Sequence, residues 1–184
     1  LVITHVSGSS YLVEHDNKKG ITNFKNLTIP TEYDAITIQK VFGGLISYAL
    51  FLSLKKGNKY RYAWMSDQAE SIDKIYYDDE HEYNSIDFLT DITVCKDDSG
   101  IYIYDQHRFG ENQLLLTLPA DTSVRELTLI DEKKDQLKSS IYEIDGKYYN
   151  YVGNTLQAQN TDDILLYVTT YETDDKIYEV SSHN

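Results

Sequence analysis

The sequence predicts an all-β protein, and three observations lead to this prediction. Apolar or aromatic residues alternate with polar ones at a period of two in several segments. Gly, Asn and Asp separate these segments at short intervals, as turn residues do. The chain also contains 17 Tyr, and Tyr, Ile, Val and Thr favour a pleated, half-buried surface. We therefore expect an antiparallel β-sandwich or a jelly-roll-like domain.

Five hairpins are predicted, each by a turn signal between two β-rich runs. The turn signals cover residues 7–9, 55–58, 97–100, 145–146 and 172–175, and the strands after them cover residues 10–14, 59–64, 101–104, 147–152 and 176–180. Asp145-Gly146 is the sharpest signal, because a type I′ turn needs a positive φ at both central residues. Residues 66–75 carry the one helical pattern, with Ser66 as the N-cap, and an acidic loop is the alternative.

The turn signals also recur at a regular spacing. Turns near Gly8, Gly57, Asp98 and Gly146 lie roughly 40 to 50 residues apart. This spacing fits a small four-unit β-propeller or a trefoil-like repeat, which is the alternative fold. We find no linker and no low-complexity segment, so residues 1–184 are expected to form a single all-β domain.

The charge balance excludes several classes of partner. The 17 Lys and Arg against 30 Asp and Glu give a net charge of −13, which opposes nucleic-acid and anionic membrane surfaces. The longest apolar stretch, residues 41–54, is interrupted by Gly and Ser and is too short to span a bilayer. We expect a soluble protein, extracellular or virion-associated rather than cytoplasmic. The single Cys95 excludes an intrachain disulfide and is expected to be a small buried hydrophobe.

Acidic residues give the one candidate metal site. The densest cluster is Asp78, Asp79, Glu80 and Glu82. Several oxygens in one loop suit calcium, but Asp is also a common turn residue, so a solvated turn is preferred. His81 lies within this cluster and is expected to be a surface histidine. No other cofactor is predicted.

No sequence motif indicates catalysis. The chain has no G-x-S-x-G elbow, no H-E-x-x-H and no phosphate-binding loop. Any two of the 30 acids could meet in the fold, so a hydrolase whose carboxylates converge in three dimensions remains the second alternative. We expect that the protein is not an enzyme.

Tyrosine provides the candidate binding surface. Tyr60, Tyr62 and Trp64 lie at i, i+2 and i+4, so they share one face of a strand. Tyr offers flat apolar area with a hydrogen-bonding hydroxyl, which suits contact with sugars and proteins. These three residues are the predicted ligand-binding stripe. The alternative is that the same face belongs to the core.

These observations favour a non-catalytic recognition module that binds a glycan, as lectins do, or a protein through a Tyr-lined β-surface. The first alternative is a structural or assembly subunit, such as a virion, fibre or toxin-complex component. Such a subunit would form homo-oligomers and bury its Tyr stripes against neighbouring chains.

Overall fold

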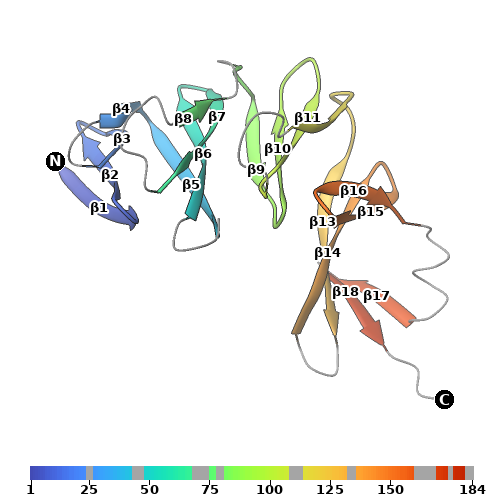
Figure 1. Cartoon of the computed structure of the whole chain (residues 1–184). Coiled ribbons are helices and arrows are strands. Elements are labelled where there is room, and N and C mark those ends of the chain that lie inside the picture. The colour runs from blue at the N-terminus through green and yellow to red at the C-terminus, as the bar shows by residue number, and fades with distance from the viewer. Residues whose placement is uncertain are drawn as a thin grey trace. The chain divides into compact units, whose positions relative to one another are not determined.

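The computed structural model describes residues 1–23, 27–42, 48–67, 75–77, 81–107, 114–131, 136–159, 169–173 and 176–180. Only the backbone is described for residues 27, 42, 75–77, 128–131, 136–140, 169–173 and 176–180. The described residues form strands and turns and no helix, which confirms the predicted all-β class (Figure 1). The described residues therefore contain no helix that is long and apolar enough to cross a membrane.

Three sheets are four-stranded antiparallel meanders in which sequential strands are neighbours. The first sheet contains β1 (Val2–Ser7), β2 (Ser10–His15), β3 (Lys18–Thr22) and β4 (Leu27–Tyr33). The second contains β5 (Ala35–Phe42), β6 (Tyr48–Lys56), β7 (Lys59–Ser66) and β8 (Ile75–Tyr77). The third contains β9 (Ser85–Phe88), β10 (Ile92–Lys96), β11 (Ile101–Asp105) and β12 (Leu114–Leu118).

The fourth sheet begins as a similar meander and adds a further hairpin. Its strands are β13 (Val124–Asp131), β14 (Gln136–Ile144), β15 (Lys147–Val152), β16 (Thr155–Ala158), β17 (Thr169–Thr173) and β18 (Lys176–Val180). β18 pairs with β13 in parallel, whereas the other pairs in this sheet are antiparallel.

The chain forms two compact units. Unit 1 comprises Leu1–Phe88 and Ile92–Ala120, and unit 2 comprises Leu89–Asp91 and Asp121–Asn184. The single domain over residues 1–184 remains a prediction.

In each meander the second and third strands are joined by a tight hairpin, at residues 16–17, 57–58, 97–100 and 145–146. These hairpins recur roughly every 40 to 50 residues. Asp145 and Gly146 have φ values of 47° and 73°, as the predicted type I′ turn requires. The corresponding turn of the first sheet is Asp16-Asn17, whereas Gly8 joins β1 to β2.

The predicted helix over residues 66–75 is wrong at both ends. Ser66 ends β7 and Ile75 begins β8, while residues 68–74 lie outside the described ranges. Polar residues after Ser66 resemble the first turn of a helix, but β7 continues through Ser66 because that residue pairs with Ala49 of β6.

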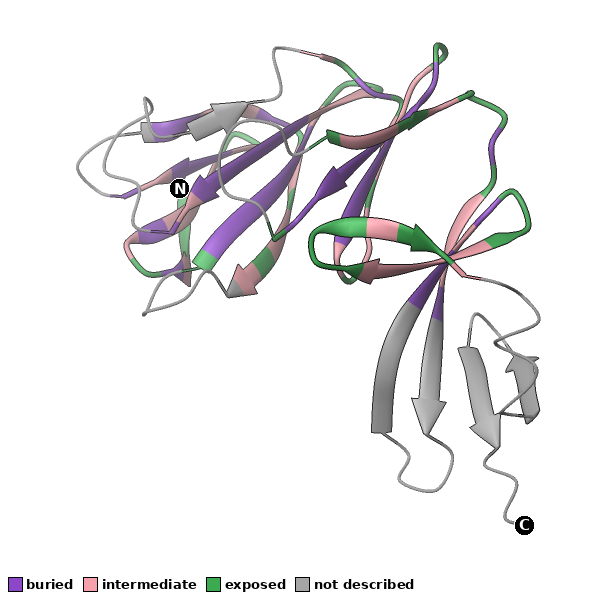
Figure 2. Cartoon of the chain, turned by 45° about the vertical axis from the view of Figure 1, so that its right-hand side comes forward, coloured by how far each residue is buried: buried purple, intermediate pink, exposed green. Residues whose placement is uncertain are grey.

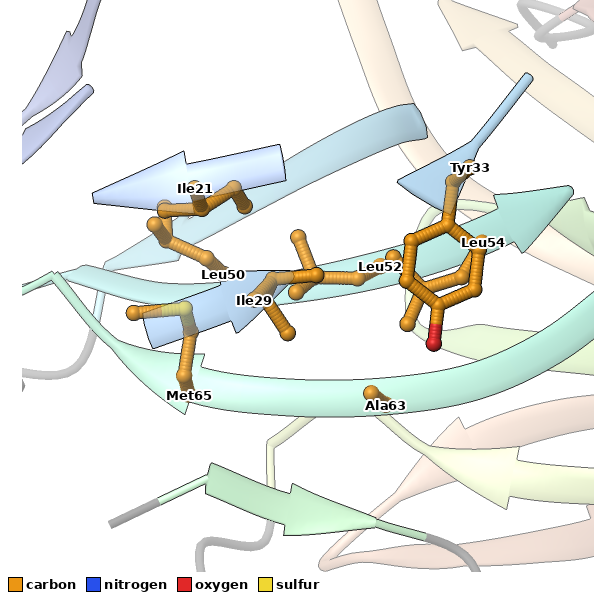
Figure 3. Packing of buried hydrophobic residues seen from close by; sticks show 8 residues of the cluster. All are labelled: Ile21, Ile29, Tyr33, Leu50, Leu52, Leu54, Ala63 and Met65. Atoms are coloured by element: carbon orange, nitrogen blue, oxygen red, sulfur yellow. The ribbon is translucent and has the colours of Figure 1, made fainter. Parts of the chain in front are cut away.

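The first and second sheets pack face to face through a mainly aliphatic core, here called the aliphatic junction. It consists of Ile21, Ile29, Tyr33, Leu50, Leu52, Leu54, Ala63 and Met65. Figure 3 shows these side chains meeting between strands of the two sheets. The first three come from β3 and β4, and the others from β6 and β7.

The opposite face of the second sheet packs against the third sheet through the aromatic junction. Its buried members are Ala49, Phe51, Tyr62, Trp64, Tyr83, Cys95 and Tyr104. Successive residues of a strand point to opposite faces, so Phe51 enters this junction while Leu52 enters the aliphatic one. The second sheet is therefore the middle layer of unit 1, and its buried residues follow β6 and β7 (Figure 2).

Unit 2 has a smaller described core. Leu127 and Ile141 are buried, and Tyr148 packs against them. Tyr142 is also buried; its hydroxyl donates to Asp91 Oδ2 at 2.8 Å and accepts a hydrogen bond from the Asp91 amide at 3.0 Å. Burial, reinforced by the Asp91 carboxylate, raises the pKa of Tyr142 far above its usual range. This phenol therefore acts as a neutral anchor for residues 89–91.

Candidate functional site

The predicted ligand-binding stripe lies on the face of β7 that turns toward the third sheet. Tyr62 is 2% exposed and Trp64 is 8% exposed, so both rings are buried in the aromatic junction. Tyr60, near the start of β7, is half-buried. Of these three rings, Tyr60 is the one that a ligand can reach in this conformation. The role of the stripe in ligand binding remains a prediction.

The buried rings of the aromatic junction form a continuous series. The centroid of the Phe51 ring lies 6.3 Å from that of Tyr62 and 6.4 Å from that of Trp64. The Tyr62 and Tyr104 rings, which come from different sheets, are 4.9 Å apart. Ring pairs at such distances stabilise a core beyond the burial of their area. The Tyr104 hydroxyl is hydrogen-bonded to that of Tyr83 at 2.7 Å, so the series continues toward the edge of the junction.

At this edge the chain crosses from the second sheet to the third. Tyr83 pairs with Tyr60 of β7 through two backbone hydrogen bonds of 2.8 and 2.9 Å. Ser85 then pairs with Lys96 of β10. Because one short segment belongs to both sheets, the sheets converge here. The Tyr83 ring meets that of Tyr102 of β11 edge to face, with centroids 5.7 Å apart.

The imidazole of His81 covers this edge. Its ring stacks on Tyr83 with centroids 4.5 Å apart and planes inclined by 22°, and it lies 5.1 Å from the Tyr102 ring. Its Nε2 is hydrogen-bonded to Oδ2 of Asp97, at the hairpin between β10 and β11. The side chain is 35% exposed. His81 is thus half-buried between two aromatic rings and a carboxylate, whereas the sequence predicts a surface histidine.

Asp97 organises the hairpin beneath His81. Its Oδ1 accepts hydrogen bonds from the Ser99 amide and hydroxyl, both at 2.7 Å, and from the Gly100 amide at 2.9 Å. Partial burial alone would raise the pKa of Asp97, but the hydrogen bonds from Ser99, His81 and Gly100 together lower it to about 2. The carboxylate is therefore ionised at neutral pH and accepts hydrogen bonds only. It follows that Nε2–H of His81 donates the hydrogen bond to Oδ2.

The Ser99 hydroxyl donates a hydrogen bond to Asp97, so the Tyr102 hydroxyl, 2.9 Å away, is the donor to Ser99 Oγ. The order of these groups matters for the chemistry. In a serine–histidine–carboxylate triad the histidine lies between the nucleophile and the acid. Here Ser99 and His81 both bond to the carboxylate, one on each oxygen. This arrangement positions groups and does not activate the serine.

A polar clip holds the crossover from outside. The backbone N–H of Asn84 donates a hydrogen bond to the Lys96 carbonyl at 2.6 Å. The Asn84 side chain accepts from Lys59 Nζ at 2.6 Å and donates to Asp98 Oδ1 at 2.7 Å. One side chain therefore joins the start of β7 to the hairpin of the third sheet. These interactions fix the two sheets at the edge where His81 lies.

The half-exposed rings at this edge, Tyr60, His81 and Tyr102, are here called the aromatic rim. They come from β7, the crossover and β11. Exposed side chains of Asn84, Asp98 and Ser99 belong to the same crossover and hairpin and provide hydrogen-bonding groups. The rim thus combines flat apolar area with polar groups on a support whose side chains are already fixed.

Two residues of the aromatic rim are partly indicated by the sequence. Tyr102 belongs to a turn-then-Tyr-x-Tyr run, and His81 has acidic sequence neighbours. Its actual partner, Asp97, lies 16 positions away. Turn composition identifies Asp97 as a hairpin residue but does not indicate which crossover packs on that hairpin.

The predicted calcium cluster is mostly beyond the described ranges. Asp78, Asp79 and Glu80 lie outside them, and Glu82 is exposed. Across the described residues, no group of three or more His, Cys, Asp or Glu side chains is arranged to hold a metal ion. Cys95 is buried in the aromatic junction, as predicted.

Comparison of the chain with protein-family models and with curated proteins yields no match.

Proposed function

We propose that the chain is a non-catalytic recognition module that binds a glycan or a protein through the aromatic rim. One observation carries the proposal: the aromatic series of the junction extends from the fully buried Phe51 to half-exposed rings at the crossover. Half-exposed Tyr rings provide contact area at low entropic cost, since they have few rotatable bonds.

The support beneath the rim favours binding. Tyr102 is held by its hydrogen bond to Ser99, and Tyr60 lies on the strand that pairs with the crossover. Groups fixed before a ligand arrives lose little conformational freedom on binding. The ordering of Ser99, Asp97 and His81 argues against an acyl-transfer enzyme at this site, as described above.

The proposal is tested by screening the chain against a glycan array and a peptide array, followed by titration of the best ligand. Tyr60→Ala should weaken binding at least about tenfold, as expected for a central aromatic contact. Tyr11→Ala is the matched control, because Tyr11 is also half-buried and its ring lies 5.1 Å from that of His5, but it belongs to the first sheet.

Circular dichroism should show cooperative unfolding for both variants, so that a loss of binding reflects the contact itself. Equal affinity of the wild-type chain and Tyr60→Ala for every ligand found would contradict the proposal. A loss of affinity in Tyr11→Ala as large as that in Tyr60→Ala would contradict it as well.

A further inference from the structure

His81 occupies a position with three defined sides. The Tyr83 ring stacks on the imidazole, the Tyr102 ring lies more steeply inclined to it, and the Asp97 carboxylate accepts a hydrogen bond from its Nε2. Tyr83 is itself fixed, because its ring is fully buried and its backbone pairs with Tyr60. The walls of this position therefore come from groups that the fold holds independently of His81.

The chemistry of these walls selects one kind of occupant. Aromatic faces attract cations, and an ionised carboxylate binds a planar N–H donor through charge-assisted hydrogen bonds. Oδ1 of Asp97 is occupied by Ser99 and Gly100, so Oδ2 remains for the group that sits between the rings. Imidazolium and guanidinium combine planarity, positive charge and N–H donors, whereas a sugar ring has neither the charge nor the planarity.

We infer that the space between Tyr83, Tyr102 and Asp97 is a subsite for a planar cationic side chain, His or Arg, of a protein partner, and that His81 fills it as an internal substitute. This inference rests on the proposed recognition function and specifies its partner. His81 lies outside the strands, so we expect the pairing of Tyr83 with Tyr60 and of Ser85 with Lys96 to persist when the imidazole leaves this position.

The test removes the internal occupant and supplies a free one. Thermal unfolding of His81→Ala is measured with increasing imidazole at a pH where imidazole is protonated. The melting temperature should rise and saturate, because a ligand that binds only the folded state stabilises it. Asp97→Asn added to His81→Ala should abolish the rise. If His81→Ala does not fold, His81→Asn leaves a smaller side chain at the same position and carries the same titration.

His15→Ala is the matched control, since His15 also has a carboxylate neighbour, Asp16 at 3.4 Å, but its side chain is 60% exposed. An equal imidazole response in His15→Ala, or none in His81→Ala, would overturn the inference. Stabilisation of His81→Ala by methyl glucoside but not by imidazole would also overturn it, because the subsite would then be one for sugars. The array experiment with Tyr60→Ala is independent, so recognition can fail while the subsite binds imidazole, or the reverse.

Discussion

The two junctions of unit 1 share one backbone plan and differ in their interiors. At the aliphatic junction the chain crosses between sheets at Asp34, whose amide donates to the Lys55 carbonyl at 2.8 Å. The Asp34 carboxylate binds Lys18 Nζ and the Gly57 amide. Asn84 makes the corresponding three contacts at the aromatic junction. The same clip therefore closes a core of Ile and Leu in one case and a core of Tyr, Phe and Trp in the other.

The difference shows how a structural core can extend to the surface. The first junction is bordered by partly buried aliphatic side chains, Val6, Leu12, Ile36 and Ile38. Near its crossover, Lys56 and Glu32 form an ion pair with a 2.7 Å separation, and both side chains are exposed. Such surface pairs contribute little to stability. The Tyr side chains of the second junction are longer than Ile or Leu and carry hydroxyls, so the aromatic series continues from the core to the rim. The aromatic junction is thus the one of the two with fixed rings at its edge.

The largest effect should come from truncating the two cores separately. Phe51→Ala removes a ring from the aromatic junction, and Leu52→Ala, the next residue of β6, truncates the aliphatic one. Both side chains are fully buried, so we expect losses of about 3–5 kcal/mol and about 2–5 kcal/mol in the free energy of unfolding, measured in urea. A loss below about 1 kcal/mol in either variant would show that its sheet packs loosely on β6.

A smaller effect is expected from the hydroxyl pair at the edge of the aromatic junction. Tyr83→Phe leaves the Tyr104 hydroxyl without its 2.7 Å partner, which should cost about 1–2 kcal/mol because a buried polar group loses a hydrogen bond. In the double variant with Tyr104→Phe, the second substitution should cost less than it does alone. Additive losses in this double-mutant cycle would mean that the two hydroxyls do not stabilise each other.

The smallest effect concerns acid stability. An unfolded aspartate has a pKa of about 3.9, and the fold lowers the pKa of Asp97 to about 2. Its stabilisation is therefore complete above about pH 5 and is lost as the pH falls from about 4 toward 2. Asp97→Asn should remove about 1 kcal/mol of this acid-dependent stability, after allowance for solvent screening.

The matched comparison is Asp34→Asn. Hydrogen bonds from Lys18 and Gly57 lower the pKa of Asp34, so the sign of the effect is the same, but the exposed Asp34 should contribute less than Asp97. Urea unfolding of both variants between pH 2 and pH 6 checks this order. A steeper acid limb in Asp97→Asn than in the wild-type chain would contradict the assigned direction.

The elements that the sequence predicts well are those determined locally. Asp145-Gly146 turns as expected, because the conformation of two residues decides the turn. The strand from Lys59 to Trp64 lies within β7 for a similar reason, since its alternation is readable in one window. Local pattern also places Tyr62 and Trp64 on one face.

What covers that face is not a local property. Tyr62 is buried because Tyr104, on a strand some 40 positions later, packs against it. A similar run on β15 leaves Tyr149 and Tyr151 half-buried. Alternation therefore identifies a stripe but does not indicate whether a further sheet lies over it. The pairing of His81 with Asp97 is hidden for the same reason, because it depends on where a crossover meets a hairpin.

The middle position of the second sheet has a consequence for how the molecule opens. β6 and β7 bury one face against each neighbouring sheet, so neither face can meet water while both neighbours stay in place. The amide protons of these two strands should exchange with solvent only when unit 1 unfolds as a whole. The amide protons of β1 should exchange through local fraying, because Leu1, Val2 and Ile3 at this end of the chain are exposed. Each outer sheet thus covers one face of the central strands, and both sheets must be lost before both faces meet water.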